Sequence, residues 1–88
     1  MKDLIQMAKL YRLECKKNGH DKFYEIIHEK GIVVKRWGRI GTEGQMMPVS
    51  FGNSDTAATN FVNLLFDSKR SKGYVLTMES EVDINSYV

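Results

Sequence analysis

The chain has 88 residues, which allows one small domain and excludes large enzyme folds, because two separate cores would each be too small to fold unaided. Hydrophobic residues make up 42% and charged residues 27% of the sequence, ordinary values for a globular domain that exclude disorder, coiled coil and collagen. The net charge of +2 is uneven, since residues 1–39 carry +5 and residues 40–88 carry −3. A one-sided positive surface suits a polyanion, although solvated basic faces are also common.

Cysteine and histidine are too scarce for a disulfide framework or a structural zinc site. Cys15 is the only cysteine and there are two histidines. No stretch approaches the roughly 18 apolar residues of a membrane span, and the N-terminus lacks the apolar run of a signal peptide. We therefore expect a cytoplasmic protein with no metal, no cofactor and no membrane association.

Strands are predicted over three segments of the first half. Apolar and polar residues alternate from about Leu10 to Cys15, as in a strand with one buried face. Residues 22–29 and 32–38 are rich in aromatic and β-branched side chains. The Lys30-Gly31 pair between them supplies the flexible position of a tight turn, so the two segments predict a β-hairpin.

A fourth strand and a helix follow. Residues 45–51 predict a strand, in which Pro48 indicates a sheet edge or a bulge. After Ser54-Asp55, which can cap a helix in competition with Asn53, apolar residues recur at three- and four-residue intervals. Gly73 suits the left-handed end of this amphipathic helix.

The chain is predicted to end in a short strand at residues 74–77 and a loose acidic tail at residues 79–88. Together the elements predict an α+β fold, a small antiparallel sheet of about four to five strands with one amphipathic helix on one face. Residues 1–88 are expected to form a single domain, with its core at about residues 8–77.

The segment from Lys35 to Arg39 is the main candidate for a functional surface. Along a regular strand Lys35, Trp37 and Arg39 lie on one face, whereas Val34 and Arg36 lie on the other. Lysine and arginine neutralise phosphates and an indole stacks on a sugar or base, so this stripe suits a nucleic-acid end. The alternative is that Trp37 is a core anchor and the charges only keep the sheet edge soluble.

A series of short motifs, in order along the chain, resembles the WGR domain family. The motifs are KFYEI at residues 22–26, RWGRIGTEGQ at residues 36–45, Phe51, the alanine-bearing helix, and KGY at residues 72–74. The similarity covers about residues 8–77. The family is named for its Trp-Gly-Arg, occurs in DNA-damage-responsive poly(ADP-ribose) polymerases, and also appears in bacteria, alone or attached to other modules.

The resemblance implies a small antiparallel sheet with one helix and, as in the polymerases, a role at DNA breaks. In those enzymes the motif tryptophan packs against the sugar–phosphate backbone near a strand end, and the motif arginine connects DNA to neighbouring domains. By position, the resemblance makes Trp37 the contact to a DNA end and Arg39 the coupling or phosphate residue. Gly38 would let the backbone pass close to its neighbours.

Two features depart from the polymerases. The 88 residues hold no catalytic, zinc-finger or helical regulatory domain to which Arg39 could couple DNA. The segment between the helix and the last strand is also shorter. The resemblance therefore supports DNA binding more directly than a relay between domains.

We expect a non-catalytic, stand-alone, bacterial-type module of DNA repair that binds DNA ends or nicks. The residues expected to contact nucleic acid are Lys22, Lys35, Arg36, Trp37, Gly38, Arg39, Lys69, Arg70 and Lys72. The alternative is a protein–protein interaction adaptor that uses the same tryptophan and arginine surface. An enzyme is not expected, because Cys15 and the serines lack the sequence context of a nucleophile.

Overall fold

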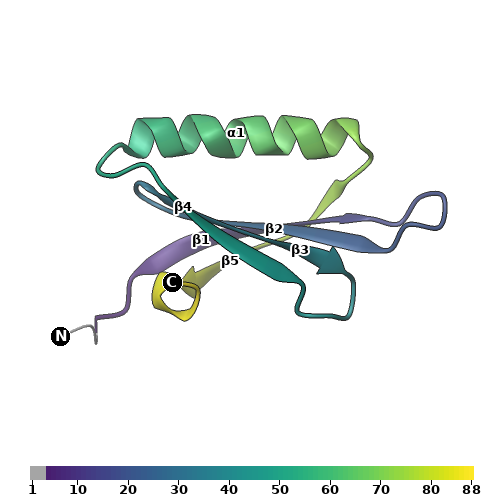
Figure 1. Ribbon diagram of the computed structural model, residues 1–88, viewed down its shortest axis with the longest axis horizontal. Helices are drawn as coiled ribbons and strands as arrows, with labels where there is room; N and C mark the ends of the chain where they lie inside the picture. The colour runs from purple at the N-terminus through teal and green to yellow at the C-terminus, as the bar shows by residue number, and fades with distance from the viewer. Residues whose placement is uncertain (1–3) are drawn as a thin grey trace.

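In a computed structural model that describes residues 4–88, five antiparallel strands form a sheet and one long helix lies across one of its faces (Figure 1). The strands are β1 (Met7–Cys15), β2 (Lys22–Glu29), β3 (Ile32–Arg39), β4 (Gln45–Ser50) and β5 (Val75–Asp83), in the spatial order β4-β3-β2-β1-β5. The helix is α1 (Asp55–Ser71), and a short 3-10 helix, η1 (Ile84–Ser86), follows β5. The predicted α+β fold is confirmed.

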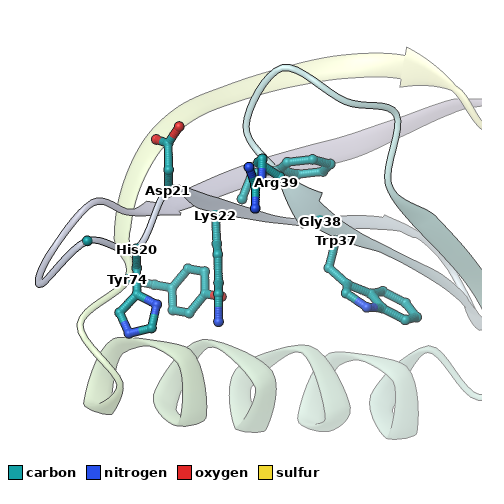
Figure 2. A pocket seen from close by; sticks show the side chains of 9 residues that line it. His20, Asp21, Lys22, Trp37, Gly38, Arg39 and Tyr74 are labelled. Carbon is teal, nitrogen blue, oxygen red and sulfur yellow. The ribbon is translucent and has the colours of Figure 1, made fainter.

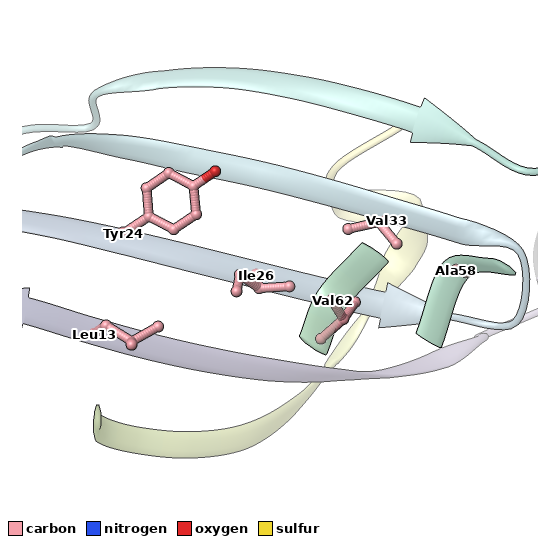
Figure 3. Close-up of a cluster of buried hydrophobic side chains, with 6 residues drawn as sticks. All are labelled: Leu13, Tyr24, Ile26, Val33, Ala58 and Val62. Carbon is pink, nitrogen blue, oxygen red and sulfur yellow. The ribbon is translucent and has the colours of Figure 1, made fainter. Parts of the chain in front are cut away.

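The main core lies between the sheet and α1. Alternate residues of the strands point toward the helix, where α1 presents side chains one turn apart. The buried side chains of this core are Leu13, Tyr24, Ile26, Val33, Ala58 and Val62 (Figure 3). Because all six are at most 6% exposed, this layer fixes the position of α1 over β2 and β3.

A second, smaller core covers the opposite face of the sheet. Leu10, Ile27 and Val34 come from adjacent strands and pack with Ile84 of η1, which is 1% exposed. The prediction of a short last strand and a loose tail from Glu79 is therefore wrong. β5 continues to Asp83 in register with β1, and η1 then folds under the sheet.

The hairpin between β2 and β3 is confirmed, but its glycine acts differently from the prediction. The left-handed residue of the turn is Lys30, with φ of 52°. A Cβ on Gly31 would overlap the carbonyl oxygen of Gly52, and the Phe51 amide donates to the Gly31 carbonyl at 2.7 Å. Gly31 is needed for this close approach of the loop that leads into α1.

Two other signals in the sequence act as predicted. Pro48 lies in β4, which is an edge strand. Ser54 is the N-cap of α1, since its hydroxyl oxygen accepts the Ala57 amide hydrogen with a donor–acceptor distance of 3.1 Å. Within residues 4–88, no helix combines the length and the apolar character that crossing a bilayer requires.

Candidate nucleic-acid interface

Of the predicted stripe, Lys35 and Trp37 lie on the face of the sheet that also carries α1, and Arg39 is exposed at the end of β3. Trp37 is half-buried and packs against the main core, and Tyr24 is its direct partner across β2 and β3. The two rings stack with centroids 6.3 Å apart and planes inclined by 27°. Lys35 places its Nζ 5.8 Å from the centre of the indole ring. Trp37 is thus a packing residue and a surface residue at once.

The turn after the Trp-Gly-Arg segment folds back onto the strand. A Cβ on Gly38 would lie 2.8 Å from the Cα of Gly44, and a Cβ on Gly44 would overlap the carbonyl oxygen of Trp37. Gly44 also has a φ of +72°, which favours glycine. The close backbone approach expected at Gly38 is therefore observed, with Gly44 as its counterpart.

An open cleft of about 590 Å³ borders the Trp-Gly-Arg segment. Its walls are the end of β3, the start of β2, the loop before β2 and Tyr74, which lies between α1 and β5. Figure 2 shows Lys22, Trp37 and His20 pointing toward α1, whereas Asp21 points away from it. The lining residues are Gly19, His20, Asp21, Lys22, Phe23, Trp37, Gly38, Arg39 and Tyr74.

The end of α1 brings Tyr74 and Lys69 to this cleft. The Tyr74 amide donates to the Lys69 carbonyl at 3.1 Å, the Gly73 amide donates to the Arg70 carbonyl at 3.0 Å, and Gly73 has a φ of +96°. This is a Schellman motif, which reverses the chain directly at the helix end. A second hollow, which shares His20, Lys22 and Tyr74 with the first, extends the cleft along Lys69 and Lys72.

Four lysines gather around the aromatic rings of the cleft; we call Lys22, Lys35, Lys69 and Lys72 the lysine cluster. The Nζ of Lys69 lies 4.3 Å from the Tyr24 ring centre and 5.6 Å from that of Tyr74. Burial, followed by the charges of Lys72, Lys35 and Lys22, lowers the pKa of Lys69. In the described part of the chain, no ion pair joins any of the four to a carboxylate.

The phenols of Tyr74, in the cleft, and of Tyr24, which stacks on Trp37, keep their protons at neutral pH. Burial, and then the neighbouring Tyr74, raises the pKa of Tyr24. Burial, and then Cys15, raises the pKa of Tyr74. The cleft therefore combines uncharged hydroxyl donors with unpaired positive charge.

Two of the expected contact residues lie elsewhere. Arg36 alternates to the opposite face of the sheet, where its Nε pairs with Glu25 at 3.0 Å. Arg70 follows Lys69 in sequence but lies on another flank of α1, with its guanidinium 5.2 Å from the Phe66 ring centre. The structure therefore brings together the other expected residues and separates Arg36 and Arg70 from them.

Tyr74 lines the cleft and Tyr24 stacks on its tryptophan, Trp37. Neither was among the expected contacts, although both belong to the motifs quoted for the resemblance. The signal for Tyr24 was present, because a hairpin closed by a two-residue turn has a fixed register that places it opposite Trp37. No comparable signal marks His20, which reaches the cleft from a loop.

The chemistry available in the cleft is the attraction of negative charge and the stacking of rings. Across residues 4–88, no three or more His, Cys, Asp or Glu side chains gather in a way that could hold a metal ion. The Cys15 thiol is buried, with Sγ 4.0 Å from the Lys72 carbonyl oxygen.

Comparison with known proteins identifies the family. The sequence model of the WGR domain matches residues 7–81. The chain belongs to the WGR domain family. WGR domains are known as nucleic-acid-binding modules, and the matched region contains the whole sheet up to Glu81 together with α1.

Two bacterial proteins are similar to parts of this chain. The uncharacterized protein y4dW of Sinorhizobium fredii is 48% identical over 42 residues, which cover 48% of this chain and 20% of y4dW. A protein of Bacteroides fragilis with a known crystal structure is 28% identical, with a TM-score of 0.73, over 78% of this chain and 19% of that protein. The chain thus matches about one fifth of the length of each of these longer proteins.

Proposed function

We propose that this WGR domain is a non-catalytic module that binds DNA ends or nicks in the cleft between Trp37 and the C-terminal end of α1. The observation that carries the proposal is the lysine cluster, which holds unpaired positive charge beside three aromatic rings. Charges held close together without counter-charges cost stability, and a phosphate backbone would relieve that repulsion.

The proposed roles follow from the geometry. Tyr24 stacks on one side of Trp37, so the indole offers its remaining exposed surface to a sugar or a terminal base. This suits the capping of an end better than insertion between two bases. Lys22, Lys69 and Lys72 would neutralise phosphates along the cleft, and the exposed Arg39 would contact the backbone at its rim.

The fluorescence of Trp37, the only tryptophan, tests the proposal directly. The protein is titrated with a 5′-phosphorylated duplex and with a closed circle of equal length, at low and near-physiological salt. We expect a saturable change with the duplex that persists at the higher salt and is weak for the circle. Binding should weaken with salt by a log–log slope of about −0.9 for each neutralised phosphate. No saturable change, or equal loss of both signals with salt, would contradict end binding.

A protein-interaction adaptor is the second candidate. It is favoured by the longer relatives, in which the matching region has other parts of the polypeptide beside it, and by the exposure of Arg39. This candidate predicts weak DNA binding at low salt only, with no preference for ends. It also predicts a specific protein partner whose binding is lost in Arg39→Ala.

A further inference from the structure

The face of the sheet opposite α1 carries a network of charged side chains that the proposed site does not use. Arg12, Glu25 and Arg36 are direct neighbours across β1, β2 and β3. One carboxylate oxygen of Glu25 accepts from Arg12 Nη1 at 2.8 Å and the other accepts from Arg36 Nε at 3.0 Å. Glu25 is only 3% exposed, and Arg12 also pairs with Glu14 at 2.8 Å. We call these four residues the reverse-face network.

The network encloses the aromatic ring that lies beneath the turn after β3. The guanidinium carbons of Arg12 and Arg36 lie 4.4 Å and 5.0 Å from the centre of the Phe23 ring. Phe23 is 1% exposed, and its Cζ would lie 3.0 Å from a Cβ on Gly44. The buried Phe23 ring therefore packs directly against this turn.

Arg36 makes one further contact, which reaches the turn itself. Its Nη1 donates to the carbonyl oxygen of Glu43 at 2.6 Å. In the same turn, the amide and the hydroxyl of Thr42 donate to the Arg39 carbonyl at 3.1 Å and 2.8 Å. Glu43 also precedes Gly44, which lies against Gly38. Arg36 is thus linked through the turn to the backbone on which Trp37 and Arg39 are carried.

We propose that Arg36 is a positioning residue, which sets the geometry of the Trp37–Arg39 segment from the opposite face of the sheet and does not contact nucleic acid. This inference rests on the proposed function, because it assigns Arg36 a role in that site. A guanidinium is suited to the task, since its planar fork bonds a carboxylate and a carbonyl in fixed directions at the same time.

The test compares Arg36→Met with Lys69→Ala. Methionine keeps apolar cover on Phe23 and removes both hydrogen bonds, while Glu25 remains paired with Arg12, so the fold should be retained. We expect Arg36→Met to weaken binding of the 5′-phosphorylated duplex about tenfold, the equivalent of one hydrogen bond to a charged group. The slope of log affinity against log salt should stay unchanged, whereas Lys69→Ala should reduce its magnitude by about 0.9.

Measurements on the free protein separate this inference from the proposed function. Hydrogen exchange at residues 41–44 should be faster in Arg36→Met than in the wild type. Arg36→Lys should be intermediate, because one ammonium group cannot bond the Glu25 carboxylate and the Glu43 carbonyl in the same directions as a guanidinium. These results are expected even if the wild type fails to bind DNA, which would overturn only the proposed function. Unchanged exchange, or a salt slope smaller by one phosphate in Arg36→Met, would overturn the positioning role.

Discussion

Lys69 differs from an ordinary surface lysine because its ammonium group rests on two tyrosine rings among three other lysines. Its pKa is lowered in the folded protein, so the unfolded chain holds this proton more tightly. Charged Lys69 therefore opposes folding at neutral pH. This unfavourable contribution disappears as the pH rises through the lowered pKa toward the ordinary value of 10.5.

Replacement of Lys69 by methionine should separate stability from binding. We expect Lys69→Met to raise the midpoint of thermal unfolding at pH 7 and to weaken DNA binding, with a salt slope smaller by about 0.9. Arg70→Met is the matched control, since Arg70 is the next residue but lies over Phe66, away from the cleft. An equal loss of affinity in both variants would mean that overall charge, and not the cleft, attracts DNA.

Trp37 can be tested with a substitution that keeps an apolar side chain against the core. Trp37→Leu keeps an apolar side chain against Tyr24 but removes the ring, and we expect it to cost about 1–3 kcal/mol of DNA binding, the usual value for lost stacking. Phe61→Leu is the control, because Lys35 lies 5.8 Å from the indole and 5.9 Å from the Phe61 ring. Fluorescence anisotropy of labelled DNA measures both variants. Similar losses would assign the effect to Lys35 and not to stacking.

At the scale of elements, the turn after β3 depends on two glycines for different reasons. Gly41 and Gly44 both have positive φ, but a Cβ on Gly41 would meet open space whereas one on Gly44 would overlap the Trp37 carbonyl oxygen. We expect Gly41→Ala to cost about 1 kcal/mol of unfolding free energy, from backbone strain alone. Gly44→Ala should cost more, by about 1–3 kcal/mol, and urea denaturation would measure the difference. Equal costs would contradict the close approach.

The segment after residue 78 shows where prediction from the sequence failed and why. Glu79 and Glu81 face water on an edge strand, so their composition resembles that of a tail although their backbone pairs with Tyr11 and Lys9 of β1. Ile84 is the buried residue that holds this segment against the sheet, and it lies in a three-residue helix that is too short to give a periodic pattern. By contrast, the hairpin and α1 were predictable, because a two-residue turn and a capped amphipathic pattern are local signals.

Ile84 should therefore contribute to stability as a core residue. We expect Ile84→Ala to lower the unfolding free energy by about 2–4 kcal/mol, the usual cost of truncating a buried aliphatic side chain. Val88→Ala, at a position 59% exposed, should change it by about 0.5 kcal/mol or less. Chemical denaturation measures both. A small effect for Ile84→Ala would contradict the packing of η1 against the sheet.

The part of the candidate site that depends on local sequence signals was predictable. Alternation along β3 placed Lys35, Trp37 and Arg39 on one face and Arg36 on the other, which needs only a regular strand. The approach of Lys69 and Lys72 to that face depends on how α1 crosses the sheet and on the reversal at Gly73. Long-range packing of this kind leaves no periodic pattern, so the approach of these lysines emerged only from the structure. The separation of Lys69 from Arg70 follows from the helix itself, in which successive residues point in different directions.

At the scale of the whole molecule, the exposed glutamates of β5 lie away from the cleft. Tyr74 of the cleft directly precedes β5, and Glu81 lies seven residues further along, roughly 23 Å away at the rise of a strand. This exceeds the Debye length of about 8 Å at physiological salt. Glu79→Gln with Glu81→Gln should therefore leave DNA affinity unchanged near physiological salt, as measured by anisotropy. A clear gain in affinity there would mean that the acidic strand competes with DNA.

Hydrogen bonds across the start and the end of the described chain bring those two regions together. The Asn85 side chain donates to the Leu4 carbonyl at 3.0 Å, and the Ile84 amide donates to the Gln6 carbonyl at 2.9 Å. Figure 1 shows the start of β1 and η1 close together at one end of the sheet. The cleft lies at the opposite end, where β1 finishes and β2 begins. A longer polypeptide could enter and leave this fold at nearly one point, as an inserted domain does, with the cleft turned outward. This arrangement fits the two longer bacterial proteins, in which the matching region makes up about one fifth of the chain.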